Sequence, residues 1–117
     1  MAILLQVDNP QTFLSTIYAD INNASIDTWK YDNEGDFTHS AKQWFKKAWH
    51  RPEPINPRLH NIYNMCFKYV LFDGDAYDHE IYGIYHGRFA EMLIRHYPND
   101  VKALRLTPLP LPGRDVV

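Results

Sequence analysis

The sequence predicts a two-layer α+β sandwich, in which a mainly antiparallel sheet carries two helices on one face. Two segments have apolar residues at helical spacing, and the segments around them have the alternation or the continuous apolar runs of strands. The chain has 117 residues, 45% of them apolar and 15% aromatic, which is enough for one core and too little for two. We therefore expect a single domain over residues 1–107, followed by an extended proline-rich tail over residues 108–117.

The first predicted strand and the first predicted helix lie at the amino end. Residues 2–7 form a short, almost continuously apolar run that is typical of a buried strand. A helix follows, because Asp8 and Asn9 can cap it and Pro10 can occupy its first position. Its apolar residues recur at helical spacing until the pair Asn22 and Asn23: Phe13, Leu14, Ile17, Tyr18 and Ile21.

A β-hairpin is predicted after this helix. Residues 26–31 alternate and place Trp29 and Tyr31 on one side, while residues 37–39 form the second strand. Between them, the acidic segment 32–36 contains a glycine and has the composition of a turn. The two strands are therefore expected to pair with each other.

The segment after the hairpin is ambiguous. Between residues 41 and 51, Trp44, Phe45 and Trp49 fit a helical stripe, but Phe45 and Trp49 also fit an alternating strand. We favour a short helix or turn that runs into an extended piece. Three prolines follow and are expected to exclude regular structure, so residues 52–60 are predicted to form a loop at the rim of the sheet.

The clearest strand pattern covers residues 61–72. One face of this strand is apolar and should point into the core: Tyr63, Met65, Phe67, Tyr69 and Leu71. After a turn at residues 73–75, residues 77–97 are predicted to form the second and longest helix. Residues 101–106 are predicted to form the last strand.

The predicted order is strand, helix, two or three strands, helix and strand. This is the split βαβ arrangement of ferredoxin-like domains, with room for an extra strand or a short helix. Right-handed crossovers would place residues 2–7 in the centre of the sheet, beside parallel partners. The comparison concerns architecture alone, and such architectures host unrelated functions.

Charge and cysteine content bear on the class of protein. With 12 basic and 14 acidic side chains the net charge is −2, so the whole domain has no field that would attract nucleic acid or anionic lipid. Cys66 is the only cysteine, which excludes an internal disulfide and favours a cytoplasmic protein. The amino terminus lacks the basic segment of a signal peptide, and 18 apolar residues never run together, so we expect no membrane span.

Two glycines are the least expected residues of the second helix. Gly83 and Gly87 lie in its interior, where each costs about 1 kcal/mol relative to alanine. With Ala90 and Ile94 they form a stripe that another backbone can approach closely. The first helix, a second subunit or a ligand could pack there.

The chain has six histidines but no recognisable metal motif. His79 and His86 are seven residues apart on one helix, too far along its axis to share an ion without a third ligand, although His39 could reach either. We predict no metal site and no cofactor, since the sequence has no phosphate-binding glycine loop and no dinucleotide fingerprint. The same histidines could act as a general acid or base, so enzymatic activity is left open.

Three functions stay open. The first and preferred one is a non-enzymatic module that binds another protein, its own copy included, because Trp, Tyr and Arg dominate protein interfaces. The second is a small enzyme or ligand-binding domain of the dimeric α+β barrel type, with a pocket between sheet and helices. The third is single-strand nucleic-acid binding through residues 42–51, where basic and aromatic side chains alternate.

The candidate binding residues follow from these hypotheses. The predicted pocket would be lined by Trp29, His39, Trp44, Tyr82 and His86. Across all three functions the candidates are Trp29, His39, Trp44, Trp49, Tyr82, His86 and Arg88, and no catalytic residue is assigned. The overall negative charge disfavours nucleic acid as the partner, so a protein partner in a homo-oligomer is preferred.

Overall fold

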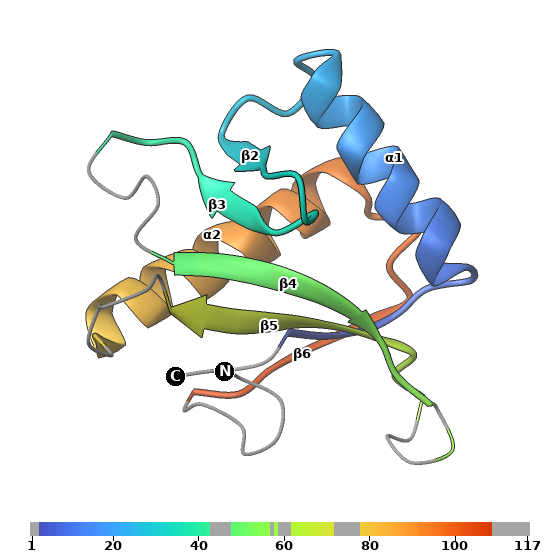
Figure 1. Cartoon of the computed structure of the whole chain (residues 1–117). Coiled ribbons are helices and arrows are strands. Elements are labelled where there is room, and N and C mark those ends of the chain that lie inside the picture. The colour runs from blue at the N-terminus through green and yellow to red at the C-terminus, as the bar shows by residue number, and fades with distance from the viewer. Residues whose placement is uncertain (1–2, 43–47, 57, 59–61, 72–77, 109–117) are drawn as a thin grey trace.

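The structure of the chain is a computed structural model, which describes residues 3–42, 48–56, 58, 62–71 and 78–108 (Figure 1). Within these residues, two helices and six strands follow one another. Their order and bounds are β1 (Ile3–Gln6), α1 (Pro10–Asn22), β2 (Trp29–Tyr31), β3 (Phe37–His39), β4 (Ala48–Pro54), β5 (Met65–Leu71), α2 (His79–His96) and β6 (Ala103–Leu106). All of them except β4 lie inside the segments predicted for them. The predicted tail, apart from Pro108, falls outside the described residues.

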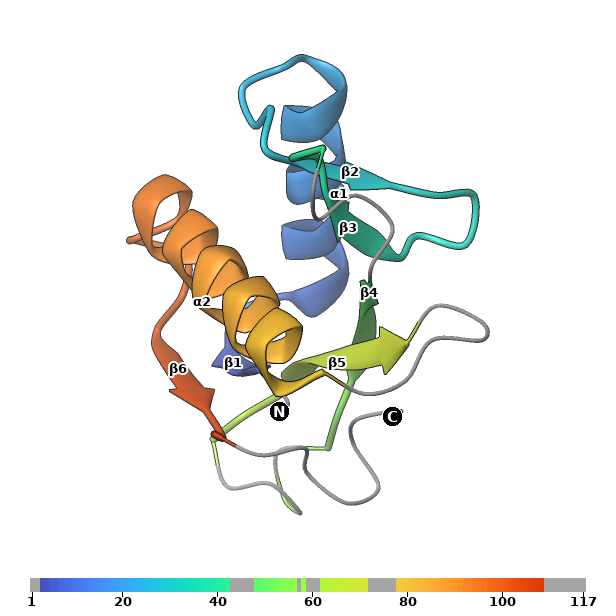
Figure 2. The same cartoon turned by 90° about the vertical axis from the view of Figure 1, so that its left-hand side faces the viewer.

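All six strands join one sheet in the order β2-β3-β4-β5-β1-β6, and every neighbouring pair is antiparallel. Figure 2 shows both helices on the same side of this sheet, which confirms the predicted two-layer α+β fold. β1 lies inside the sheet, but β5 and β6 both run antiparallel to it, so the expected parallel partners are wrong. The split βαβ pattern has four strands, whereas the β2–β3 hairpin adds two beside β4, and a strict ferredoxin-like topology stays a prediction.

The two helices begin at side-chain caps. At α1, the side chain of Asn9 accepts a hydrogen bond from the Thr12 amide (3.1 Å), and Pro10 occupies the first turn. At α2, Asp78 accepts hydrogen bonds from two amides of the first turn in the same way. Within the described residues, neither helix has the length and apolar character of a membrane span.

The main core lies between the sheet and the two helices. Its buried side chains come from both layers: Ile3 and Leu5 of β1, Phe13 and Ile17 of α1, Trp29 of β2, Phe37 of β3, Met65, Phe67 and Tyr69 of β5, and Tyr82, Tyr85, Phe89 and Leu93 of α2. The alternation predicted for β5 is therefore right for Met65, Phe67 and Tyr69. Both helices bury their apolar faces against this one side of the sheet.

Tyr63 does not belong to that core. It packs instead with Leu4, Ile55 and Cys66 in a second apolar cluster. Leu4 alternates along β1 with two residues of the main core, so this cluster lies on the opposite face of the sheet. Tyr63 comes before the first residue of β5, and the alternation of that strand does not extend to it.

Strand β4 corrects the prediction that residues 52–60 form a loop. β4 continues to Pro54 and pairs with β5 along its whole length, with Pro52 opposite Phe67 and Pro54 opposite Met65. Proline is tolerated in a strand where its missing N–H would point away from the partner strand. β3 pairs with β4 only at His50, so the described sheet has no further strand beside the two prolines.

The tip of the β2–β3 hairpin is attached to α1. The Tyr18 hydroxyl donates a hydrogen bond to the Gly35 carbonyl oxygen (2.7 Å). Gly35 has a positive φ of 82°, and a Cβ at this position would lie 2.5 Å from the Tyr18 oxygen, so the turn requires glycine. Burial, followed by the nearby carboxylate of Asp36, raises the pKa of Tyr18 to about 12, so this hydroxyl stays a donor at neutral pH.

Candidate functional site

A cavity of about 310 Å³ lies between the β2–β3 hairpin and the second half of α2, both labelled in Figure 1. Its wall comes from the root of the hairpin and from one face of the helix: Thr28, Trp29, His39, Ala41, Arg88, Glu91, Met92, Arg95 and His96. The helical members recur at steps of three and four residues from Arg88, so they project from the same side of α2. The cavity is thus built from two elements that are far apart in the sequence.

Strand pairing positions the hairpin side of the cavity. Trp29 and His39 are directly opposite each other in the β2–β3 register. Their rings meet edge to face with centroids 5.0 Å apart, a favourable geometry for aromatic pairs. Trp29 is 1% exposed and His39 is 9% exposed, so both rings are held by packing. They form a rigid wall.

The helical side of the cavity carries more positive than negative charge. Arg88 and Arg95 contribute guanidinium groups, and among the described residues of the wall Glu91 is the only one with a carboxylate. Arg88 reaches Glu91 at 3.5 Å, but both side chains are about three-fifths exposed (61% and 59%), so this ion pair is weak. Arg95 forms no ion pair with the residues that the structure describes. The two guanidinium groups can therefore turn toward a ligand at little cost.

The tautomer of His39 follows from its hydrogen bond. The Ala41 amide donates to Nδ1 of His39 (3.0 Å), so Nδ1 carries no proton and the neutral ring is protonated at Nε2. Burial, and after it the positive charge of Arg88, lower the pKa of His39. At neutral pH the imidazole is therefore uncharged and offers an Nε2–H donor.

A second group of histidines lies deeper in the molecule. His50 of β4 and His86 of α2 are both fully buried (0% exposed), and Nε2 of His50 is 2.8 Å from Nδ1 of His86. The His50 ring is stacked on Phe89 and Tyr85, with centroids 4.6 and 5.7 Å away. Burial, followed by the neighbouring His86, holds the pKa of His50 well below its usual value.

Trp29 separates the two groups of histidines. One edge-to-face contact joins it to His39 at 5.0 Å, and another joins it to His50 at 5.4 Å. His39 lies in the wall of the cavity, whereas His50 and His86 lie within the packed aromatic core. The cavity and the buried pair are neighbours that share one indole ring.

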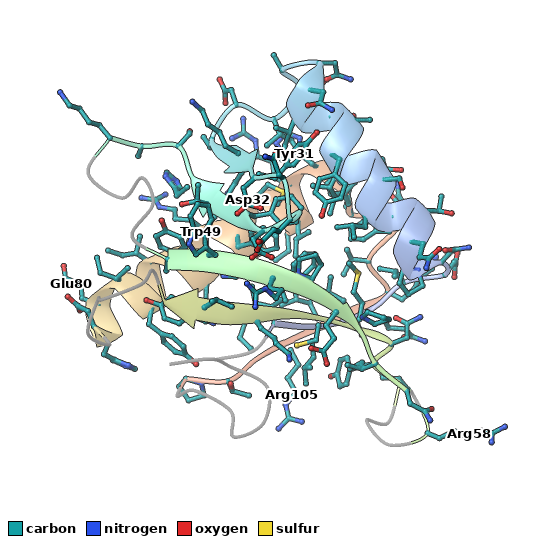
Figure 3. All side chains as sticks on the ribbon, in the orientation of Figure 1. Tyr31, Asp32, Trp49, Arg58, Glu80 and Arg105 are labelled. Carbon is teal, nitrogen blue, oxygen red and sulfur yellow. The ribbon has the colours of Figure 1, made fainter. Side chains whose placement is uncertain are left out.

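Six of the seven predicted binding residues are described by the structure, and they fall into three places. Trp29, His39 and Arg88 meet at the cavity. Tyr82 and His86 lie in the core with their rings 4.7 Å apart, so the single pocket expected from the sequence is divided. Trp49 is half-buried on β4, where Figure 3 labels it, and Trp44 lies outside the described residues.

Several residues of these two groups were not predicted. Arg95 and His96 could have been found by continuing the helical spacing from Arg88 by about two turns. His50 could not be placed, because the segment around it fits both a helix and a strand. Its proximity to His86 arises only from the packing of β4 against α2.

In the described part of the basic segment 42–51, most polar side chains make contacts within the domain. Lys42 is exposed, but His50 is buried in the core. Arg51 forms an ion pair of 2.8 Å with Asp36, whose side chain is only 4% exposed. Two of the polar residues proposed to contact nucleic acid are thus engaged inside the domain.

The acidic turn between β2 and β3 brings three carboxylates together. One oxygen each of Asp32, Glu34 and Asp36 lies within 4.8 Å of the others. Two of these carboxylates already have partners, since Asp32 accepts hydrogen bonds from the amides of Glu34 and Asp36 (2.9 and 3.0 Å), and Asp36 binds Arg51. The carboxylates therefore belong to the hydrogen-bonded turn that the sequence predicts between the two strands.

The glycines of α2 face outward. Gly83 and Gly87 are exposed, and no described atom of the chain outside the helix lies within 4 Å of where a Cβ would stand. α1 does not pack on this stripe, and the stripe by itself identifies no partner.

Comparison with known proteins adds no constraint on the chemistry of these sites. The cavity and the buried pair are therefore interpreted from their own geometry. No protein-family model, no curated protein and no solved structure matches the chain.

Proposed function

We propose that the chain binds a small anionic ligand, one that carries a phosphate or carboxylate group, in the cavity between the β2–β3 hairpin and α2. The observation that carries this proposal is the convergence of Arg88, Arg95, His39 and His96 on one cavity. A volume of about 310 Å³ is at the lower end of the range for ligand sites, which suits a metabolite-sized molecule.

The two arginines supply the attraction for the anion. A guanidinium group matches the geometry of carboxylate and phosphate and can donate two parallel hydrogen bonds. Arg95 and His96 lie in the last turn of α2, where the helix dipole favours positive side chains and disfavours a free anion. A ligand at this end of the helix therefore depends on the arginine side chains rather than on the backbone.

His39 and Trp29 supply direction and shape. The Nε2–H of His39 is an uncharged donor whose ring is fixed by the Ala41 amide and by Trp29. Donors held in place by packing lose little entropy when a ligand binds. We therefore expect the imidazole to orient the acidic group and Trp29 to bound the cavity on its core side.

Titration of the whole chain with inorganic phosphate and with acetate, followed by amide chemical shifts, tests the proposal. We expect shifts at residues 28–42 and 88–96. Arg88→Gln and Arg95→Gln should each weaken binding about tenfold or more, because each removes a charge-assisted hydrogen bond of about 1.5–3 kcal/mol. Arg105→Gln is the matched control, since Arg105 is an exposed arginine on β6, outside the cavity wall (Figure 3).

The control separates a site from general charge attraction. If Arg105→Gln weakens binding as much as Arg88→Gln, the anions are attracted only by the surface charge, and the proposal is wrong. It is equally wrong if neither anion shifts any resonance around the cavity.

The other functions suggested by the sequence stay predictions. A protein partner and a homo-oligomer rest on composition and on the outward-facing glycines of α2, and a cytoplasmic location rests on the single cysteine. Nucleic-acid binding through residues 42–51 has lost support, because His50 is buried and Arg51 is paired with Asp36.

A further inference from the structure

We propose that the buried His50–His86 pair is an acid-sensitive latch, which holds α2 against β4 at neutral pH and releases it when the pair takes up a proton. This inference is independent of the proposed ligand site, since it concerns the core side of Trp29. The hydrogen bond between the two rings joins residues 36 apart in the sequence and links the sheet directly to the helix.

The hydrogen bond uses one nitrogen of each ring and leaves the other nitrogen inside the core. Two neutral imidazoles 2.8 Å apart share one hydrogen, so one ring donates and the other accepts. Nδ1 of His50 has no hydrogen-bond partner among the described residues. Whichever ring donates, a protonated His50 carries an N–H on both of its nitrogens, and the N–H at Nδ1 has no acceptor among the described residues.

An added proton has no favourable place in this site. A protonated His50 would place a charged ring, with an N–H at Nδ1, in the space bounded by Trp29, Tyr85 and Phe89. Stacking on two aromatic rings offers a cation some attraction, but less than the hydration it loses on burial.

No described carboxylate is free to neutralise that charge. The elements around the pair present Trp29 from β2, Phe37 and Thr38 from β3, Tyr69 from β5, and Tyr82 and Tyr85 from α2. The tyrosines and the threonine offer hydroxyl groups but no carboxylate. Asp36, beside Phe37 on β3, is already bound by Arg51, and His39 lies beyond Trp29.

The direction of the pH effect follows from these surroundings. Burial, and then His86, lower the pKa of His50 in the folded state below that of the unfolded chain. Between these two values the unfolded chain binds more protons, so stability is full above about pH 6.5 and decreases as the pH falls below it. One such group raises the unfolding constant about tenfold between pH 7.5 and pH 5.5.

Urea unfolding at pH 7.5 and pH 5.5 tests the latch. For the wild type we expect the unfolding constant to rise about tenfold or more between these values. The double variant His50→Phe/His86→Phe replaces both partners by apolar rings of similar shape, a change that can be nearly neutral. Its unfolding constant should rise clearly less than that of the wild type, and the lowered pKa of His39 accounts for the remaining pH dependence. His79→Gln, an exposed histidine on the same helix, should behave like the wild type.

Nitrogen-15 spectra of the imidazoles in the wild type give an independent measurement, which also applies if the double variant does not fold. His50 should keep the signals of a neutral ring in the folded protein at pH 5.5, with protonated signals only in the unfolded state. Titration of His50 near pH 6.5 while the protein stays folded would overturn the proposal. An undiminished pH dependence in a folded double variant would overturn it as well.

Discussion

The two histidine sites on either side of Trp29 differ in what surrounds the same kind of side chain. His39 is in a cavity wall with two arginines, and one of its nitrogens accepts a backbone hydrogen bond. His50 is fully buried among aromatic rings, and its described hydrogen bond goes to another histidine. In both places burial lowers the imidazole pKa. Only the cavity leaves a donor that a ligand could use.

This difference separates a binding role from a structural role. Around the cavity, charged side chains are exposed and can be removed with little effect on folding. Around the buried pair, His50 is hydrogen-bonded to His86 and the Thr38 hydroxyl to that of Tyr85, and the loss of one partner leaves the other without hydration. Substitutions on the cavity side should thus alter affinity, and those on the core side should alter stability.

The largest effect is expected at the residue that both sites share. Trp29→Ala removes a side chain that is 1% exposed and contacts His39, His50, Tyr85 and Phe89. The free energy of unfolding should fall by about 3–5 kcal/mol, as measured by urea unfolding. Trp49→Ala, at a half-buried position, should cost clearly less. A loss below about 1 kcal/mol for Trp29→Ala would mean that this ring is not the common wall of the two sites.

A smaller loss of stability is expected on the core side alone. The Thr38 and Tyr85 hydroxyls form a buried hydrogen bond of 3.0 Å. Thr38→Val should reduce the free energy of unfolding by about 1–3 kcal/mol, because it leaves the Tyr85 hydroxyl with one partner fewer. Adding Tyr85→Phe should cost less in this background than alone, which a double-mutant cycle measures. Strict additivity of the two changes would show that the hydroxyls do not interact.

The smallest effect is expected on the cavity side. Glu91→Gln removes the only carboxylate among the described residues of the cavity wall and breaks the ion pair with Arg88. Affinity for inorganic phosphate should rise about two- to fivefold at low salt, while stability changes by less than about 0.5 kcal/mol. Chemical-shift titration measures the affinity, with Glu80→Gln at the outer end of α2 as control (Figure 3). Weaker binding by the Glu91→Gln variant would contradict a site for anions.

Local signals predicted most of the fold. The cap at Asn9, the proline at position 10 and the regular apolar spacing were sufficient for α1, and the acidic turn was sufficient for the β2–β3 hairpin. The second half of β4 was missed because proline disfavours strands in general. The cost of a proline in a strand depends on whether its missing N–H would face a neighbouring strand. Which strands are neighbours is known only from the assembled sheet.

The candidate site was less accessible from the sequence. Aromatic and basic composition pointed to Trp29, His39 and Arg88, which do meet at the cavity. The sequence could not show that Tyr82 and His86 lie apart from the cavity residues. That separation arises only from the packed position of Trp29 between the two histidine sites. His50 gave no local signal, because its neighbour His86 belongs to another layer of the domain.

The attachment of Gly35 to Tyr18 has a practical consequence for labelling the protein. Hairpin tips commonly accept an inserted epitope or a fused reporter, because little else touches them. Here the tip is tied to α1, and the same hairpin carries His39 at its other end. An insertion after residue 33 would strain the anchorage of a cavity wall, so a reporter is better placed elsewhere on the chain.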